Sequence, residues 1–373
     1  MAGEPENQRI ARLTPLADVL ERIGTLVTPV APREAALGDA LFRVLASDVR
    51  GDRGLPAEPR ALVDGYAVRA DDIADAGAYA PVPLANAPIR VDVGDALPPG
   101  TDAVVPHDAI VERGGRFQAV APAVAGDGVL AACADLRAGD CIARAGWRLN
   151  DFTLAMLAAS GHDRVSVRAP RIRLLKAKPG RDAMIDAAVD LLARALNARG
   201  CAVSRTAGDL EVALAGQASD AVIAVGGTGT GRNDASVNTL ARRGRVEVHG
   251  VAIAPGESSA FGMTGGRPVL LLPGRLDSAI AGWLTIGVPL VDRLSGSREA
   301  ADPGVTAMLD RKVASPLGLV DIVPVRLAAG KAEPIASGYW PLARLADSDG
   351  WIVVPAGSEG FPAGSEVMVR PLP

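Results

Sequence analysis

The chain has 373 residues, which is more than one hydrophobic core usually organises, so several domains are expected. Hydrophobic residues make up 49% of the chain and aromatic residues only 3%, so the cores must consist mainly of aliphatic side chains. The formal net charge of −4 gives no electrostatic reason to expect a nucleic-acid partner.

The sequence shows no signature of a metal cluster, a disulfide framework or a membrane segment. The three cysteines and three histidines are scattered and lack the paired spacing of metal ligands. The first residues contain no apolar signal-peptide core, and no run of roughly 18 apolar residues occurs. We therefore expect a cytoplasmic protein without a membrane partner.

Helical patterns dominate the first 50 residues. Thr14-Pro15 is typical of a helix start, with an N-cap oxygen followed by proline at the first helical position. Apolar residues then recur at helical spacing, at Leu16, Val19, Leu20 and Ile23. A second helix is predicted over residues 34–46. Residues 1–50 and 145–169 are assigned to an N-terminal helical and linker domain.

A β-rich insertion is predicted for residues 51–144, where short apolar runs alternate with Gly and Pro. Its expected strands include 66–68, 89–91, 103–105 and 117–120. The chain then returns to the first domain with a helix over 147–161 and a strand over 165–167.

Residues 170–300 alternate between strand and helix patterns, with glycines after the strands, which predicts an open α/β sheet. The expected strands are 172–175, 202–203, 221–225, 246–253 and 269–272, and the expected helices are 184–198, 209–215, 233–242 and 276–294. Residues 303–373 contain further short strands and are predicted to form a C-terminal β-barrel, with a β-sandwich as the alternative.

A glycine-rich loop follows the most apolar of these strands, and its residues are Gly226, Gly227, Thr228, Gly229, Thr230 and Gly231. Glycines let the backbone approach a ligand closely, and N–H groups at a following helix N-terminus favour an anion. The loop therefore suggests a phosphate-binding site, although a turn needed only for packing is an alternative. A nicotinamide site is excluded because no strand with a ribose-binding acid follows, and the Lys-Ser/Thr of a P-loop is missing.

Each charged residue near this loop has two possible roles. Asp234 is expected either to cap the next helix or to bind Mg²⁺ beside a phosphate. Arg275, in the loop Pro273-Gly274-Arg275, is expected either to bind an anion through the paired N–H groups of its guanidinium or to lie in solvent. The cluster of Lys176, Lys178 and Arg181 suits an anionic substrate but also an ordinary polar loop.

The chain resembles the molybdopterin molybdenumtransferases, the MoeA and gephyrin E-domain family. Asp64–Arg69 reads D-G-Y-A-V-R, as in that family. Motifs resembling the family's occur in the same order at Asp64–Arg69, Leu97–Val105, Asp135–Asp140, Gly226–Asp234, Pro255–Gly262, Leu272–Ala279 and Gly338–Pro371. The resemblance covers nearly the whole chain and implies that its α/β domain is MogA-like.

The resemblance also implies a function. It predicts that the protein binds adenylylated molybdopterin and molybdate and inserts molybdenum with the help of Mg²⁺. It places catalytic acids at Asp182, Asp209 and Asp234, with Asp182 and Asp234 as metal ligands. The loops Gly226–Gly231 and Pro273–Arg275 would bind the substrate. Asp64 and Asp135 would close the site from the second subunit of a homodimer.

Several positions depart from the family pattern at charged residues. Ala254 and Glu257 replace the two lysines of K-P-G-K-P, and Arg275-Leu276 replaces N-P. Pro59 stands where the first motif has its leading Asp. An alternative is therefore a paralogue without turnover that binds the cofactor or delivers it to a molybdoenzyme client, and an unrelated role on the same fold is a third possibility.

Overall fold

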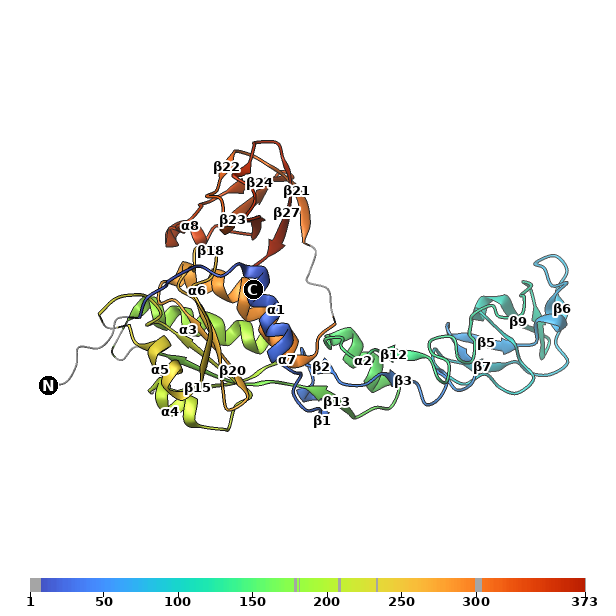
Figure 1. Cartoon of the computed structure of the whole chain (residues 1–373). Coiled ribbons are helices and arrows are strands. Elements are labelled where there is room, and N and C mark those ends of the chain that lie inside the picture. Colours follow the sequence, from blue (N-terminus) through green and yellow to red (C-terminus); the bar gives the residue numbers. More distant parts are fainter. Residues whose placement is uncertain are drawn as a thin grey trace. The chain divides into compact units, whose positions relative to one another are not determined.

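The structure of the protein is a computed structural model, and it describes residues 8–177, 180, 182–206, 209–232, 234–298 and 304–372. The chain divides into two compact units, and each is described by itself (Figure 1). The first unit contains the residues up to 47, residues 145–154 and those from 163 onward. The second contains residues 48–144 and 155–162. The division into four domains that the sequence suggests stays a prediction.

A six-stranded open sheet forms the centre of the first unit, in the order β15-β14-β16-β20-β19-β17. The first four strands run parallel, and the last two complete the sheet in antiparallel pairs. The strands are Arg171–Lys176 (β14), Ala202–Thr206 (β15), Ala221–Val225 (β16), Arg245–His249 (β17), Ala260–Thr264 (β19) and Arg267–Leu272 (β20). All residues of β16 are buried, as a central strand covered on both faces requires. The predicted open α/β sheet is confirmed, and β19 is a strand that the sequence reading missed.

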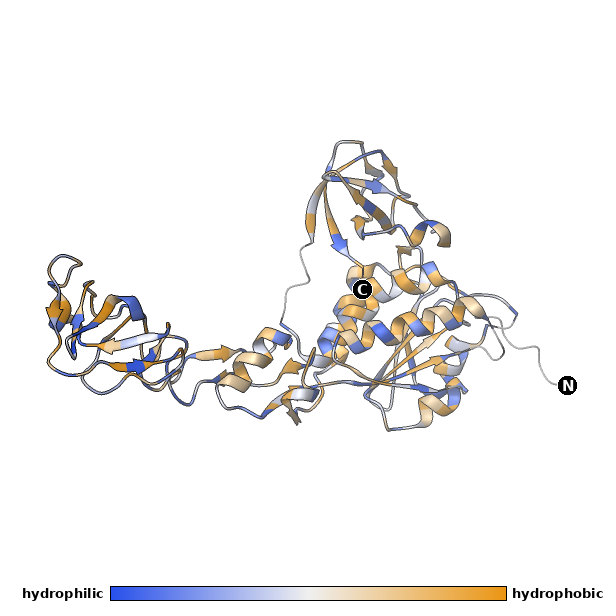
Figure 2. Ribbon diagram, turned by 180° about the vertical axis from the view of Figure 1, so that it is seen from behind, coloured by the Kyte–Doolittle hydropathy of each residue, from blue (hydrophilic) through white to orange (hydrophobic). Residues whose placement is uncertain are grey.

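Helices cover both faces of this sheet because neighbouring strand residues point to opposite sides. Ile223 and Val225 pack in a cluster with α1, α3, α6 and α7, whereas Val222 and Ala224 pack in another with α4 and α5. The helices are Leu16–Leu26 (α1), Ala183–Ala198 (α3), Leu210–Ala215 (α4), Ser236–Arg243 (α5), Leu276–Gly282 (α6) and Val288–Ser295 (α7), with a π-turn, Trp283–Gly287, between the last two. Figure 2 shows polar and apolar residues mixed along helices such as α3, which has one buried face and one exposed face. In α6, by contrast, residues 277–282 are all buried.

The predicted helix over residues 34–46 is wrong. The segment forms β1 (Arg33–Ala36), a 3₁₀ turn (Leu37–Asp39) and β2 (Val44–Leu45), and both strands pair with β13 (Arg164–Arg168). Phe42 has a φ of 63°, a left-handed conformation that an α-helix does not contain. The strand partner lies far along the chain, so the local helical spacing could not reveal it.

The start of α1 also differs from the prediction. Pro15 is the N-cap residue of α1, and no side chain caps the helix there. Thr14 instead forms a parallel bridge with Val251, and its N–H donates to the carbonyl oxygen of Gly250 at 2.9 Å. The helix itself is confirmed, because Val19 and Ile23 are buried as its spacing indicates.

The second unit is rich in short strands, as predicted. It contains the three-stranded sheets β7-β5-β8 and β6-β10-β9 and the separate two-stranded pairs β11-β4 and β12-β3. The elements are Val49–Arg50 (β3), Arg60–Ala61 (β4), Gly65–Val68 (β5), Val82–Pro83 (β6), Ile89–Val91 (β7), Ala103–Val105 (β8), Ile110–Arg113 (β9), Arg116–Ala119 (β10), Val129–Leu130 (β11) and Cys141–Ala143 (β12), with 3₁₀ turns at Ala70–Ile73 and His107–Ala109. Helix α2 (Asp151–Ala159) spans the boundary between the two units. Tyr66 packs on the core of the second unit and lies edge-on to His107, with ring centroids 5.2 Å apart.

The C-terminal residues form the predicted β-barrel. The order β23-β24-β21-β27-β25 closes through the pairing of β23 with β25, so five strands form a ring. β18 (Ile253–Ala254) extends from the α/β part and pairs in parallel with β23. The elements are Val305–Leu309 (β21), Val313–Ala314 (β22), Val320–Ala328 (β23), Lys331–Pro334 (β24), Leu342–Leu345 (α8), Gly350–Val354 (β25), Gly360–Phe361 (β26) and Glu366–Pro371 (β27).

In the part of the chain that the structure describes, no helix combines the length and the apolar character needed to cross a membrane.

Candidate functional site

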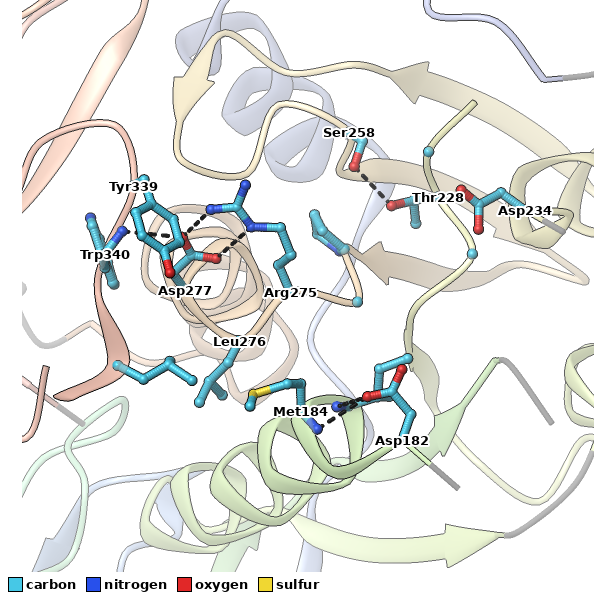
Figure 3. Close-up of a pocket in the computed structure, with 16 residues that line it drawn as sticks. Asp182, Met184, Thr228, Asp234, Ser258, Arg275, Leu276, Asp277, Tyr339 and Trp340 are labelled. Atoms are coloured by element: carbon cyan, nitrogen blue, oxygen red, sulfur yellow. Dashed lines mark hydrogen bonds and ion pairs between the residues drawn. The ribbon is translucent and has the colours of Figure 1, made fainter. Parts of the chain in front are cut away.

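A pocket of about 590 Å³ lies in the first unit, beyond the carboxyl ends of the parallel strands (Figure 3). In open α/β sheets, ligands bind at this edge because the loops after neighbouring strands converge there. Loops after β16 and β20, the N-terminus of α3 and the segment before α8 all contribute. The lining residues are Asp182, Met184, Ile185, Gly227, Thr228, Gly229, Asp234, Ser258, Pro273, Gly274, Arg275, Leu276, Asp277, Tyr339, Trp340 and Leu342.

The glycine-rich loop after β16 needs its first two glycines. Gly226 and Gly227 have φ values of 102° and 72°, which side chains other than glycine rarely adopt. A Cβ atom on Gly227 would lie 2.4 Å from Ser236 Oγ, which in turn donates to the carbonyl oxygen of Gly226 at 2.8 Å. The loop backbone therefore packs directly on the start of α5. Gly227, Thr228 and Gly229 line the pocket, whereas Gly226, Thr230 and Gly231 do not.

The N-terminus of α5 is already capped by a distant side chain. The Gln8 carboxamide is buried, and its Oε1 accepts from the N–H groups of Val237 and Asn238 at 3.1 and 3.3 Å. Its Nε2 donates to the carbonyl oxygens of Gly227 and Gly229, both at 2.7 Å. The amides that the sequence suggested for an anion are thus bonded within the chain, and no pattern in the sequence pointed to Gln8.

Two further contacts fix the middle of the loop. The hydroxyl groups of Thr228 and Ser258 lie 3.0 Å apart, and His249 Nε2 lies 2.9 Å from the Thr228 carbonyl oxygen. Ser258 belongs to the segment that replaces the family's K-P-G-K-P motif, so two predicted motifs meet in this wall of the pocket.

The two predicted metal ligands both line the pocket. Asp182 is the N-cap of α3, and its Oδ1 accepts from the N–H groups of Met184 and Ile185. Asp234 Oδ2 accepts from the N–H of Gly231 at 3.2 Å. Each carboxylate therefore has a structural role in shaping its own loop, and each lies at the pocket wall. Asp234 bonds a loop amide, whereas Gln8 bonds the first amides of α5, so this position does not support the helix cap expected of Asp234. Its reading as a metal ligand stays a prediction.

The other predicted acids lie elsewhere. Asp209 caps α4 through a bond from the Glu211 N–H at 2.9 Å and is not among the pocket-lining residues. Asp64 and Asp135 belong to the second unit. Asp64 Oδ1 accepts from the N–H of Val93 at 2.7 Å.

The basic cluster after β14 is only partly described. Lys178 and Arg181 lie outside the described residues. Lys176 forms an ion pair with Asp186, with Nζ and Oδ1 2.8 Å apart, and its side chain is only 15% exposed.

Arg275 is held by a buried carboxylate that sequence reasoning missed. Its Nε donates to Asp277 Oδ1 at 3.2 Å and its Nη2 donates to Asp277 Oδ2 at 2.5 Å. Asp277 is only 2% exposed, and its carboxylate also accepts from the N–H groups of Ser278 and Trp340. Burial alone would raise the pKa of Asp277, but these hydrogen bonds, led by that from Arg275, lower the pKa below its usual value.

An aromatic ring completes this side of the pocket. The Arg275 guanidinium carbon lies 4.9 Å from the ring centroid of Tyr339, a cation–π contact. Figure 3 shows Arg275 between this ring and the Thr228–Ser258 pair. The available sequence signals were an aspartate two positions after a loop arginine, and Tyr339 as one of only three tyrosines.

The chain is similar to known proteins along most of its length. Three family models match the chain: the MoeA N-terminal region (domain I and II) over residues 14–161, the probable molybdopterin binding domain over 173–293, and the MoeA C-terminal region (domain IV) over 306–372. Together they match most of the chain in order.

The chain belongs to the MoeA family.

Relatives and solved structures extend along the whole chain. Molybdopterin molybdenumtransferase 1 of Mycobacterium tuberculosis is 28% identical, with 93% of this chain and 96% of that protein covered. A molybdopterin biosynthesis protein of Methanocaldococcus jannaschii is also 28% identical, with 90% and 91% covered. The crystal structure of the molybdopterin biosynthesis MoeA protein from Pyrococcus horikosii superposes with a TM-score of 0.75 at 28% identity and covers 97% of this chain and 100% of that one. The pocket therefore lies in a MoeA fold. Most of its lining residues belong to the segment that matches the probable molybdopterin binding domain, and Tyr339, Trp340 and Leu342 belong to the segment that matches the MoeA C-terminal region.

Proposed function

We propose that this protein is a molybdopterin molybdenumtransferase of molybdenum cofactor biosynthesis. It binds adenylylated molybdopterin and molybdate in the pocket of the first unit and inserts molybdenum into the dithiolene. The observation that supports this most directly is the pocket itself. Two predicted substrate loops and two predicted acids line one cavity, and all four belong to the segment that matches the probable molybdopterin binding domain.

The size and shape of the pocket suit a substrate of this class. Small-molecule sites usually occupy roughly 300–1,000 Å³ and combine apolar walls with a few polar groups, and this pocket measures about 590 Å³. Met184, Leu276 and Leu342 supply apolar wall, and the glycine loop exposes backbone close to the ligand. The protein binds and orients the substrate through these surfaces.

The charges of the pocket favour a cation bound together with the substrate. Its described lining residues include three carboxylates, Asp182, Asp234 and Asp277, against one guanidinium, Arg275. A substrate that carries a pyrophosphate and enters with molybdate would be repelled by this excess of negative charge. A divalent cation between the carboxylates and the phosphates removes the repulsion.

Mg²⁺ is the cation that we propose. In the described part of the chain, no group of three or more His, Cys, Asp or Glu side chains is arranged to hold a metal. Mg²⁺ commonly takes one or two carboxylates and completes its shell with phosphate oxygens and water. Asp182 and Asp234 fit that role from two loops, but they do not form a site built from protein ligands alone. When bound, such an ion neutralises phosphate charge and favours cleavage of the pyrophosphate.

A homodimer is part of the proposal, with Asp64 and Asp135 contributed by the second subunit. Asp64 is flanked by exposed apolar side chains: Leu62 is 51% exposed, Val63 40% and Val93 62%. Exposed apolar groups beside a polar residue are typical of a surface that another protein covers.

We also propose a cytoplasmic location, with which the three free cysteines are compatible, since reduced thiols persist there.

Release of AMP tests the transferase function. Purified protein with adenylylated molybdopterin, molybdate and Mg²⁺ should release AMP, and removal of Mg²⁺ by chelation should stop the release. Asp182→Asn and Asp234→Asn keep hydrogen-bond acceptors for the loop amides but lose the charge, so each should lower the rate by about a hundredfold. Asp18→Asn changes an exposed carboxylate on α1 and is the matched control.

The same assay examines Asp209 and the alternative without turnover. Asp209→Asn preserves the α4 cap, and we expect a smaller loss of rate than for Asp182→Asn because Asp209 is outside the pocket lining. Tight binding of adenylylated molybdopterin without AMP release would contradict the transferase and favour a paralogue that delivers cofactor to a molybdoenzyme. The relatives, which include named molybdenumtransferases, favour turnover.

A further inference from the structure

We propose that a tetrahedral oxyanion of the substrate binds on the outer edge of the Arg275 guanidinium, and that Asp277 and Tyr339 are positioning residues that hold this edge toward the pocket. The inference rests on the proposed function and assigns to Asp277 and Tyr339 a role in substrate recognition. It also places the anion at Arg275 and not at the N-terminus of α5.

The fork between Arg275 and Asp277 fixes the plane of the guanidinium. Two parallel N–H···O bonds join Nε and Nη2 to the two oxygens of one carboxylate. Such bidentate geometry restricts the orientation of the group more than a single bond does. Both bonds lie on the Nε–Nη2 edge, so the Nη1–Nη2 edge is the one presented away from Asp277.

Asp277 is itself immobilised. Its carboxylate is almost fully buried and accepts from the Ser278 N–H at 2.7 Å and from the Trp340 N–H at 3.2 Å. Trp340 is buried too, and its Nε1 donates to the Ile322 carbonyl oxygen at 3.0 Å. The start of α6 and the segment before α8 therefore fix the carboxylate from both sides.

Tyr339 restricts the remaining freedom of Arg275. Its ring covers one face of the guanidinium at 4.9 Å, although 58% of the tyrosine is exposed. Arg275 itself has 60% of its side chain exposed, so without the ring and the fork it would move freely in solvent. Together the two contacts leave one face and one edge of the guanidinium open to the pocket.

The N–H groups at the start of α5 and the described lysine after β14 are already engaged, and the family's two lysines are replaced. Gln8 occupies the N–H groups of Val237 and Asn238 at the start of α5. Lys176 is paired with Asp186. At the positions of the family's two lysines, Ala254 is buried and Glu257 accepts a bond from the Gly256 N–H. Arg275 is the one cation among the described residues that line the pocket.

The pairing with Asp277 weakens the attraction for an anion but does not cancel it. An anion on the outer edge lies closer to the guanidinium than to the carboxylate behind it, and Coulomb attraction falls with distance. The ion pair therefore weakens the attraction of Arg275 for an anion but holds its guanidinium in one orientation. It favours an anion whose two oxygens match the planar fork, which a phosphate or a molybdate provides.

Binding of AMP and adenosine to the full-length protein tests the inference. The ratio of the two dissociation constants measures the contribution of the phosphate, because the two probes share the nucleoside. Arg275→Gln should weaken AMP binding by about tenfold and adenosine binding by less than about twofold. Sodium molybdate alone, measured by calorimetry, distinguishes molybdate from phosphate as the bound oxyanion.

The positioning residues are tested by substitutions for which a positioning role predicts a different change in AMP binding from the one that the alternative role predicts. Asp277→Asn removes a negative charge, so a purely electrostatic role predicts tighter AMP binding, whereas a positioning role predicts weaker AMP binding with adenosine unchanged. Tyr339→Phe keeps the stacked ring and should bind AMP like the unaltered protein, and Tyr339→Leu should bind it more weakly. Because Asp277 is buried, thermal unfolding is used to check that the Asp277→Asn protein folds. If it does not fold, the comparison of Tyr339→Phe with Tyr339→Leu, at an exposed position, tests the inference.

Arg370→Gln is the matched control, because Arg370 also stacks on an aromatic ring, that of Trp351 at 5.2 Å, but does not line the pocket. It should leave the AMP-to-adenosine ratio unchanged. If the Arg275 and Tyr339→Leu variants keep the ratio for AMP and bind molybdate normally, the inference is overturned while the proposed function stands. A protein that binds none of AMP, adenosine and molybdate contradicts both.

Discussion

Single buried carboxylates in this protein differ in how well their charge is compensated. The Asp277 carboxylate accepts hydrogen bonds from Nε and Nη2 of Arg275 and from the N–H groups of Ser278 and Trp340. The Ser278 hydroxyl donates to it as well. Asp321, on β23, is fully buried and accepts from the Ser337 hydroxyl at 2.8 Å. Its Oδ1 and the nearby buried Ser315 hydroxyl form no hydrogen bond of normal geometry among the described residues, although the Ser315 hydroxyl and the Gly338 N–H lie close enough to favour the charged form. Burial raises the pKa of Asp321 above its usual value of 3.8.

Asp321→Asn should therefore stabilise the protein at neutral pH. A carboxyl whose folded pKa is raised contributes stability below the unfolded pKa and loses it as pH rises through the folded value. At neutral pH the charged form is thus unfavourable, and the amide should raise the free energy of unfolding by about 1 kcal/mol.

Urea unfolding at several pH values checks this prediction. The gain should shrink below about pH 4, where the carboxyl is protonated in both states. Glu366→Gln, on the exposed side of β27, should change little at any pH. A destabilised Asp321→Asn protein at neutral pH would show that the carboxylate is compensated by groups beyond Ser337.

At the scale of elements, the Gln8 side chain links the glycine loop to the N-terminus of α5 by hydrogen bonds. The carboxamide bonds two helix amides and two loop carbonyls that are 219 to 230 residues away in the sequence. The loop thereby keeps its shape without a ligand, and the helix N-terminus is closed. Recognition of an anion then depends on the Arg275 side of the pocket.

Gln8→Ala should lower the free energy of unfolding by about 1–3 kcal/mol, because buried donors and acceptors lose their partners. Differential scanning calorimetry measures the loss, with Gln217→Ala at an exposed position as control. Millimolar phosphate should restore part of the stability of the Gln8→Ala protein only, since its α5 amides become available to an anion. Equal thermal stability of Gln8→Ala and the unaltered protein would contradict the capping role.

At the scale of the whole molecule, the residues proposed for one active site are divided between two units of the chain. Asp182 and Asp234 line the pocket of the first unit, whereas Asp64 and Asp135 belong to the second. If the second unit completes the site of a partner copy, each site needs two chains.

Complementation between two inactive variants tests this arrangement. Asp64→Asn and Asp182→Asn homodimers should each lack AMP release, but a mixed dimer contains one site with both acids intact. Random assembly of equal amounts should then recover roughly a quarter of the normal activity. Light scattering verifies the dimer, and the absence of any recovery in mixed dimers would contradict a shared site.

Local sequence patterns predicted much of the architecture. The apolar run 221–225, the spacing from Met184 onward and the glycines after the strands encode their own elements, because strand burial and helix periodicity are local properties. The motif order likewise predicted the family. The segment 34–46 was misjudged because its strands depend on β13, a partner more than a hundred residues away.

The sequence by itself determined the lineage, the α/β core, the barrel and the loops that line the pocket. Only the tertiary structure decided which polar groups meet there. Gln8 reaches Val237 across 229 residues, and Asp277 reaches Trp340 across 63. Such bonds leave no periodic trace in the sequence, since their geometry arises only when the packed elements bring distant side chains within hydrogen-bonding distance.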